Sequence, residues 1–146
     1  MSTDQAQPKR PSILVVNDNH EAADSARFIL NLLGYPSHVA YDAGKALQLV
    51  RAHAPQAVLL DLAMPGGNGL ELAQELRRLP ETKHALLICI SGFARADDRR
   101  LSRQAGCDHH LQKPFDWFEL LRLLDDGTAA KGDGAPTGLL FESAQE

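Results

Sequence analysis

Four polar side chains stand where short apolar runs of the sequence stop. Asp18 (after Asn17), Asp61, Ser91 and Lys113 each follow such a run. Carboxylate oxygens are ligands that Mg²⁺ prefers, and a carboxylate can also attack phosphorus to give an acyl phosphate. A hydroxyl and an ammonium can hold phosphoryl oxygens, because this transfer depends mainly on positioning and electrostatics. The set predicts phosphoryl transfer to an aspartate, with Asp61 as the nucleophile.

Each of these residues also has an ordinary structural interpretation when it is taken singly. Asp18 and Ser91 would be caps or loop residues, and Lys113 would be a surface lysine. Asp61 would be a turn residue before the glycines of 66–69. Their coincidence at the ends of successive runs is what favours a common site.

The apolar runs have the pattern of buried parallel strands. The runs at 13–16, 57–60 and 86–90 are continuous rather than alternating, which indicates strands covered on both faces. Two weaker strands are expected at 37–41 and 109–112, and helix-period segments separate all five. Five strand-then-helix repeats predict an α/β fold, a doubly wound parallel sheet with helices on both faces. In such a sheet, ligands bind beyond the carboxyl ends of the strands.

Several residues mark the expected helix ends. Gly34 and Gly106 stand where glycines commonly follow a helix, and Asp42 stands where a cap begins one. Asp116 followed by Glu119 has the spacing of a capping box before a last helix. The boundaries of the helices are therefore predicted from individual residues.

The composition predicts one folded domain with an unstructured segment at each end. Residues 1–11 are expected to be disordered, 12–125 to form the domain, and 126–146 to be a flexible tail. The reason for the last boundary is the stretch from Asp125 to Gly138, which is rich in glycine and poor in apolar residues.

Charge and hydropathy exclude some classes of partner. A formal net charge of −4 argues against nucleic-acid binding. No apolar run approaches the ~20 residues of a membrane-spanning helix, and no signal peptide is evident, so a cytoplasmic protein without a membrane partner is expected. Cys89 and Cys107 lack the C-x-x-C spacing of a metal or redox motif, so both are expected to be buried free thiols.

Four sequence segments together carry a family resemblance. They are ILVVNDN at 13–19, VLLDLAMPGGNG at 58–69, ISGFA at 90–94 and AGCDHHLQKPF at 105–115. In this order and spacing the chain resembles the receiver domain of two-component response regulators. The resemblance implies a flavodoxin-like five-stranded sheet of order 2-1-3-4-5 with five helices, and a cis peptide bond between Lys113 and the following proline.

The resemblance also implies a role for each residue at the strand ends. Asp61 would be the phospho-acceptor, with Lys113 and the switch hydroxyl of Ser91 beside it. Asp18, Asp61 and the backbone carbonyl of Ala63 would bind Mg²⁺ or Mn²⁺.

Two positions depart from the family pattern. Asn17 replaces an acidic residue that the family usually has, so it would contribute to the metal site only indirectly, and Mg²⁺ affinity should be reduced. His110 stands where the family has a switch aromatic residue. Its imidazole would either turn inward with Ser91 or remain a polar side chain on the flank of the strand.

The expected function is that of a single-domain receiver that is not an enzyme beyond its own phosphorylation and dephosphorylation. It would take the phosphoryl group from a histidine kinase or a histidine phosphotransfer protein and signal by phosphorylation-dependent binding to an unidentified protein. Because neither Ala63 nor Phe93 could orient a water, a long-lived phosphoryl group is expected.

Three alternatives remain open at this point. One is a pseudo-receiver that acts without phosphorylation, motivated by Asn17. Another is a phosphorelay intermediary of a hybrid-kinase pathway. A small Mg²⁺-dependent aspartyl-phosphate phosphohydrolase is disfavoured, because Ala63 occupies the position of its second aspartate.

Overall fold

A sheet of five parallel strands lies at the centre of the molecule. The computed structural model describes residues 10–64, 69–92 and 96–133, and its strands are ordered β2-β1-β3-β4-β5. The strands are β1 (Ile13–Val16), β2 (Ser37–Ala40), β3 (Ala57–Asp61), β4 (Leu86–Ser91) and β5 (His109–Gln112). The predicted parallel sheet and its order are confirmed.

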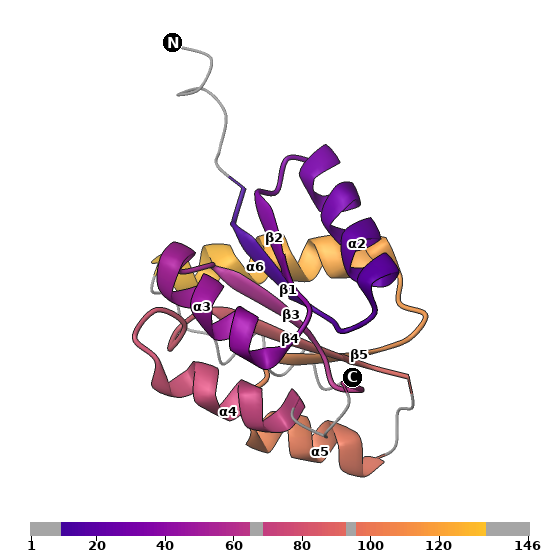
Figure 1. Ribbon diagram of the computed structural model, residues 1–146, viewed down its shortest axis with the longest axis vertical. Coiled ribbons are helices and arrows are strands. Elements are labelled where there is room, and N and C mark those ends of the chain that lie inside the picture. The colour runs from indigo at the N-terminus through magenta and orange to yellow at the C-terminus, as the bar shows by residue number, and fades with distance from the viewer. Residues whose placement is uncertain (1–9, 65–68, 93–95, 134–146) are drawn as a thin grey trace.

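Five helices in the described residues cover the two faces of the sheet. They are α2 (His20–Leu32), α3 (Ala43–His53), α4 (Gly69–Arg78), α5 (Ala96–Gln104) and α6 (Trp117–Asp133). Figure 1 shows α2 and α6 on one face and α3, α4 and α5 on the other. The fold is therefore the doubly wound α/β arrangement that the sequence predicts.

The core consists of two apolar clusters, one on each face of the sheet. On β4, Leu87 and Cys89 pack in the cluster that includes residues of α3 and α4, whereas Leu86 and Ile88 pack in the cluster that includes residues of α2 and α6. Successive side chains of a strand point to opposite faces, so a strand covered on both sides must be apolar at every position. This explains the continuous apolar runs in the sequence.

The predicted helix boundaries agree with the structure at four residues. The Asp42 side chain accepts a hydrogen bond at the start of α3, and Asp116 accepts one from the backbone N–H of Phe118 at the start of α6. Gly34 and Gly106 have φ angles of 95° and 109° beyond the ends of α2 and α5. Glycine reaches this left-handed region without a steric penalty.

The expected start of a flexible tail at residue 126 is wrong, because α6 continues to Asp133. Gly127 is buried in this helix, and a Cβ atom there would lie 2.6 Å from Cδ1 of Leu86. The glycine therefore allows α6 to approach β4 closely, although in sequence it looks like part of a linker. The rest of the expected tail, 134–146, lies outside the described residues, as do residues 1–9.

The expectation of two free thiols is also wrong. Cys89 and Cys107 are buried as expected, but they form a disulfide, with their Cα atoms 6.2 Å apart. Cys89 lies in β4 and Cys107 lies in the turn before β5. The C-x-x-C rule considers only neighbours along the chain, whereas here the parallel pairing of β4 and β5 brings the two sulfur atoms together.

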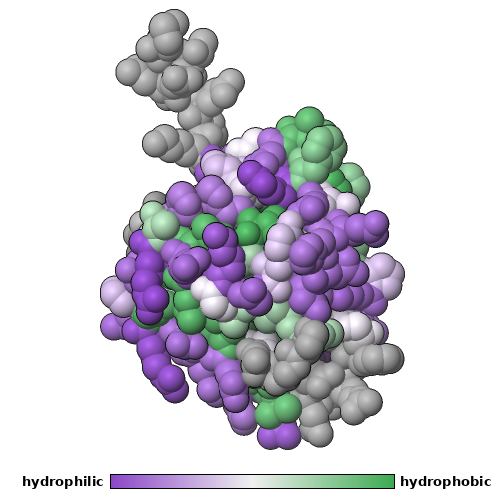
Figure 2. Space-filling view, viewed as in Figure 1, coloured by the Kyte–Doolittle hydropathy of each residue, from purple (hydrophilic) through white to green (hydrophobic). Residues whose placement is uncertain are grey.

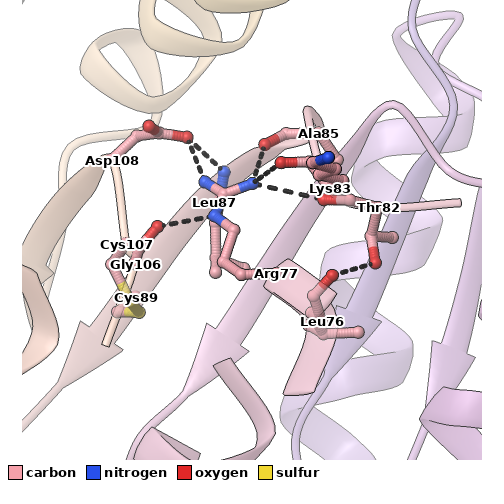
Figure 3. Close-up of polar contacts among 10 residues, drawn as sticks. All are labelled: Leu76, Arg77, Thr82, Lys83, Ala85, Leu87, Cys89, Gly106, Cys107 and Asp108. Atoms are coloured by element: carbon pink, nitrogen blue, oxygen red, sulfur yellow. Dashed lines mark hydrogen bonds and ion pairs between the residues drawn. A yellow bond between two sulfur atoms is a disulfide. The ribbon is translucent and has the colours of Figure 1, made fainter. Parts of the chain in front are cut away.

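The amino ends of β4 and β5 are joined by a single arginine, Arg77, at the end of α4 (Figure 3). Its guanidinium group donates hydrogen bonds to the backbone carbonyls of Thr82, Lys83, Ala85 and Gly106 and to the carboxylate of Asp108. The Asp108 carboxylate also accepts from the backbone N–H of Leu87, at 2.9 Å. Helical periodicity places Arg77, four residues after the buried Ala73, nearer the core than its exposed neighbour Arg78, but it does not indicate these partners. We call this set of contacts the Arg77 clamp.

A second polar cluster at the amino end involves a residue from the expected disordered segment. The Tyr35 hydroxyl donates to Asp125 of α6 at 2.7 Å and accepts from Arg10 at 3.2 Å. Pro11 is buried. Residues 10 and 11 are therefore packed on the domain, and the N-terminal boundary at residue 12 is slightly misplaced.

Most large apolar side chains are buried, but some gather on the surface at the end of α2. Phe28 and Leu32 are 68% and 73% exposed, and Leu33 is partly exposed beside them. Figure 2 shows hydrophobic residues over this end of the helix, at the upper right. The group lies at the amino end of the sheet.

Candidate functional site

The carboxyl edge of the sheet carries the four residues that the sequence predicts to form the site, Asp18, Asp61, Ser91 and Lys113. Asp61 and Ser91 are the last residues of β3 and β4, and Lys113 follows the last residue of β5. Val16, the last residue of β1, pairs with Leu60 of β3, so the residues that follow β1 lie at the same edge. Parallel pairing therefore brings together residues that are far apart in sequence.

Asp61 and Lys113 form the centre of the site. Nζ of Lys113 lies 2.6 Å from Oδ2 of Asp61, although 52 positions separate the two residues. The backbone N–H of Ala63 donates to Oδ1 of Asp61 at 2.8 Å. The Asp61 side chain is 6% exposed and that of Lys113 is 42% exposed, so a buried carboxylate is paired with an ammonium that reaches it from the surface.

The backbone around the pair explains how the two side chains meet. The N–H of Lys113 donates to the carbonyl of Ser91 at 2.8 Å, which continues the β4–β5 pairing beyond the end of β5. The Lys113–Pro114 bond is cis, as the resemblance implies. On the other side, a Cβ atom on Gly69 would lie 2.8 Å from Cα of Leu62, so glycine at this position lets α4 begin directly against the residue after Asp61.

Asn17 and Asp18 lie beyond the end of β1. Asp18 is exposed, whereas Oδ1 of Asn17 accepts a hydrogen bond from the backbone N–H of Asn19 at 3.0 Å. Asn19 in turn caps α2 by accepting from the N–H of Ala22 at 3.1 Å. Asn19 was not singled out in the sequence, although asparagine is a favoured capping residue. The oxygen of Asn17 therefore helps to shape the turn that presents Asp18.

The donor set at this edge suits a hard divalent cation. Each carboxylate oxygen has two lone pairs, so Asp61 keeps acceptor capacity beyond its bonds to Lys113 and Ala63. Within the described ranges, no group of three or more His, Cys, Asp or Glu residues could hold a metal. Mg²⁺ takes only one or two protein carboxylates and completes its shell with water and phosphate oxygens. Asp18 and Asp61 fit Mg²⁺ better than a metal that needs an all-protein shell.

Ser91 and His110 form a hydrogen-bonded pair beside the ion pair. Oγ of Ser91 lies 2.8 Å from Nε2 of His110, and Ser91 is 7% exposed. The sequence identifies both as candidate switch residues but does not indicate that they bond to each other. The imidazole therefore faces the hydroxyl rather than lying on the outer flank of the strand.

The pKa values of Tyr35, His38 and Tyr41 are shifted, and these three residues are not members of this set. Burial, and then the hydrogen bond to Asp125, raise the pKa of Tyr35 to about 12. Burial, and then the neighbouring His53, lower the pKa of His38, whose ring stacks on that of His53. The hydrogen bond to Asp24 raises the pKa of Tyr41.

Comparison with known proteins agrees with this geometry. The chain is 31% identical over 104 residues to the polar-differentiation response regulator DivK of Brucella anthropi, covering 71% of this chain and 85% of DivK. A CheY-like response regulator receiver domain from Methanospirillum hungatei superposes with a TM-score of 0.78 at 25% identity, covering 86% of this chain and 99% of the other.

A further solved structure bears on the metal. It is the receiver domain of the sensor histidine kinase PA1611 from Pseudomonas aeruginosa, with a magnesium ion coordinated in its active-site cleft. Its TM-score is 0.73 at 28% identity, over 82% of this chain and 98% of that one.

The sequence model of the response regulator receiver domain matches residues 13–125, which is most of the chain. Together with the fold and the order of the strands, this match shows that the chain belongs to the response regulator receiver domain family of two-component signalling.

Proposed function

We propose that this receiver domain accepts a phosphoryl group on Asp61 and signals by changing the protein that it binds. The observation that carries the proposal is the contact of 2.6 Å between Lys113 Nζ and Asp61 Oδ2 at the carboxyl edge of the sheet. This contact supports the proposal because a carboxylate can act as the nucleophile and an ammonium beside it can bind the phosphoryl oxygens.

The chemistry assigns a separate task to each group. A carboxylate oxygen of Asp61 forms a bond to phosphorus while the bond from phosphorus to the donor breaks, and the electron pair of that bond leaves with the donor. Lys113, which already contacts the carboxylate, stabilises the negative charge of the phosphoryl oxygens. The hydroxyl of Ser91 supplies a hydrogen bond to one of these oxygens. Since the carboxylate is buried, competing water has limited access to it.

Asp18, Asp61 and the backbone carbonyl of Ala63 are the proposed ligands of Mg²⁺ or Mn²⁺, and Asn17 acts only through the turn. The cation would neutralise the phosphoryl group as it approaches the carboxylate. The magnesium ion in the active-site cleft of the PA1611 receiver domain supports this assignment. Because the oxygen of Asn17 accepts a backbone hydrogen bond and carries no charge, an Asn17→Asp variant should bind Mg²⁺ more tightly. Magnesium titration followed by NMR shifts measures this, and equal affinities would contradict it.

The proposed phosphodonor is a histidine kinase or a histidine phosphotransfer protein in the cytoplasm. No described helix has the length and apolarity needed to cross a membrane. A role as an intermediary in a phosphorelay uses the same site and differs only in what receives the phosphoryl group from Asp61.

The proposed switch consists of Ser91 and His110. In the structure Ser91 Oγ bonds to His110 Nε2, so movement of the hydroxyl toward a phosphoryl group acts directly on the imidazole. We expect this movement to change the surface formed by α5, β5 and α6, to which the downstream protein binds.

Incubation with Mg²⁺ and acetyl phosphate tests the phosphorylation. We expect intact-protein mass spectrometry to detect one phosphoryl group on the wild-type chain and none on Asp61→Asn. Asp126→Asn is the matched control, since Asp126 is an exposed carboxylate on α6, and it should be phosphorylated like the wild type. Phosphorylation of Asp61→Asn at the wild-type rate would refute the proposal.

A pseudo-receiver that acts without phosphorylation is the second candidate, and the occupied oxygen of Asn17 is the observation that favours it. No acyl phosphate on the wild-type chain, together with partner binding by the unmodified protein, would support this alternative. Hydrolysis of varied phosphate esters would instead support the phosphohydrolase, which Ala63 disfavours.

The acyl phosphate is proposed to be long-lived. Ala63 has no side-chain group that could orient an attacking water, and the other position of interest, Phe93, lies outside the described residues. A half-life of seconds, measured by loss of the phosphorylated mass, would show that another group activates water.

A further inference from the structure

Cys89 and Cys107 are the only cysteines of the chain, and the described contacts give them no role in phosphoryl transfer. Their Cα atoms are 6.2 Å apart, within the usual range for a disulfide. In the part of the chain that the structure describes, they also belong to no cluster that could bind a metal.

The disulfide encloses the elements that would carry the signal. The segment from Cys89 to Cys107 contains Ser91 and all of α5, and Cys89 pairs with His110 in the register of β4 and β5. A crosslink at this point joins β4 to the turn that leads into β5, and these two strands carry the hydrogen bond between Ser91 and His110. Closing a loop of this kind reduces the conformational freedom of the enclosed chain.

The turn that carries Cys107 does not depend on the disulfide for its position. The Arg77 clamp holds the residues on either side of it, through the carbonyl of Gly106 and the carboxylate of Asp108 (Figure 3). Reduction should therefore leave the fold intact and change mainly the freedom of the enclosed segment.

We propose that Cys89 and Cys107 form a reversible redox modification site, which rigidifies the segment from β4 to β5 when it is oxidised. The regulatory part rests on the proposed function. In the reducing cytoplasm that we propose for this protein, a disulfide is typically transient and redox-sensing rather than structural.

The exchange partner is a small-molecule disulfide such as oxidised glutathione. Both residues are buried, Cys107 at 7% exposed and Cys89 at 0% exposed, so the exchange takes place in a local opening of the fold. The Cys107 thiolate, the nearer of the two to the surface, attacks first and forms a mixed disulfide, releasing one glutathione thiolate. The Cys89 thiolate then attacks the Cys107 sulfur and releases the second glutathione. Two protein thiols are oxidised, one oxidised glutathione is reduced to two thiols, and the two protons end on glutathione.

The first experiment concerns the chain alone. After incubation with oxidised glutathione, unfolding in N-ethylmaleimide should label no thiol, and after incubation with dithiothreitol it should label both. Amide exchange in α5 should be about tenfold slower in the oxidised form, which corresponds to fewer local openings. In Cys107→Ser and, as a second variant, Cys89→Ala, exchange should not respond to either reagent. Two labelled thiols after oxidation, or equal exchange in the two forms, would overturn the proposal.

The second experiment concerns regulation. Because Ser91 would be held more firmly against the phosphoryl group, the acyl phosphate on Asp61 should last longer in the oxidised chain, and its lifetime in Cys107→Ser should be independent of reductant. Equal lifetimes in the two forms of the wild type would exclude regulation. If the disulfide forms and protects α5 but no acyl phosphate is ever detected, the proposed function fails and the redox site stands. If the acyl phosphate forms but both thiols remain reduced after incubation with oxidised glutathione, the redox site fails and the proposed function stands.

Discussion

The two ends of the sheet use charged side chains for different purposes. At the amino end, Arg77 is 20% exposed and Asp108 11% exposed, and their hydrogen bonds run to backbone groups of the turns around them. At the carboxyl end, Lys113 is 42% exposed and contacts Asp61, whose carboxylate keeps acceptor capacity. The ion pair at the amino end therefore stabilises the fold, whereas the ion pair at the carboxyl end leaves a carboxylate that can still bind a ligand.

This difference shows where the protein tolerates change. Removing one partner of a largely buried, fully hydrogen-bonded pair leaves polar groups without compensation, and this destabilises the fold. Removing a partly exposed lysine costs less stability, because solvent already surrounds part of its side chain and screens the ion pair. We therefore expect substitutions at the amino end to alter stability and substitutions at the carboxyl end to alter chemistry.

The largest effect is expected for Arg77→Met. This change removes the cation beside Asp108 and leaves several carbonyls unsatisfied, so the free energy of unfolding should fall by about 3 kcal/mol. Urea denaturation measures this. Arg78 is the exposed neighbour of Arg77, so Arg78→Met is the matched control and should change the free energy of unfolding by less than about 0.5 kcal/mol. Similar values for the two variants would remove the contrast between the two ends of the sheet.

Lys113→Met tests the opposite end. We expect phosphorylation by acetyl phosphate to slow by about 100-fold, as for the loss of a preorganised electrostatic contact, and stability to change by less than about 1 kcal/mol. Mass spectrometry over time and urea denaturation give the two values. Lys113→Arg keeps the charge and should recover part of the rate. A large loss of stability with an unchanged rate would reverse the assignment of the two ends.

Ser91 and His110 should behave as a coupled pair. In a double-mutant cycle with Ser91→Ala and His110→Phe, the stability effects should deviate from additivity by about 1 kcal/mol, because each single change breaks the same hydrogen bond. His110→Gln retains a hydrogen-bonding group and should deviate less. Strict additivity in urea denaturation would show that the bond contributes nothing to the folded state.

The smallest effect is expected at Tyr35, and it depends on pH. The pKa of Tyr35 is raised to about 12 in the folded chain, so the folded state holds the proton more tightly than the unfolded state, whose tyrosine pKa is about 10. Its stabilisation is complete below pH ~10 and is lost as the pH rises toward 12. Tyr35→Phe should cost about 0.5 to 1 kcal/mol at neutral pH, through loss of the bond to Asp125, and should show a flatter profile above pH ~10. Parallel profiles for the two proteins in urea denaturation would contradict the assignment.

Much of the fold and the site could be predicted because the signals are local. Continuous apolar runs imply strands buried on both faces, and Asp42, Gly34 and Gly106 mark helix boundaries through their own conformational preferences. In a parallel sheet, the residue that follows each apolar run lies at the carboxyl edge, and Asp61 and Ser91 do lie there, as the last residues of β3 and β4. Such features depend on a residue and its immediate neighbours, which the sequence contains in full.

Other features depend on which distant residues become neighbours, and these only the tertiary structure decided. Helical periodicity places Arg77 nearer the core than Arg78, but only the tertiary structure shows that its guanidinium group bonds to the turns before β4 and β5. Gly127 looks like a linker residue until Leu86 is placed against it. Cys89 in β4 and Cys107 just before β5 become neighbours only when these two strands pair in the folded sheet. The sequence by itself determined the order of the elements and the residues at their ends, whereas packing between elements determined which side chains touch, because that depends on distances that no local pattern encodes.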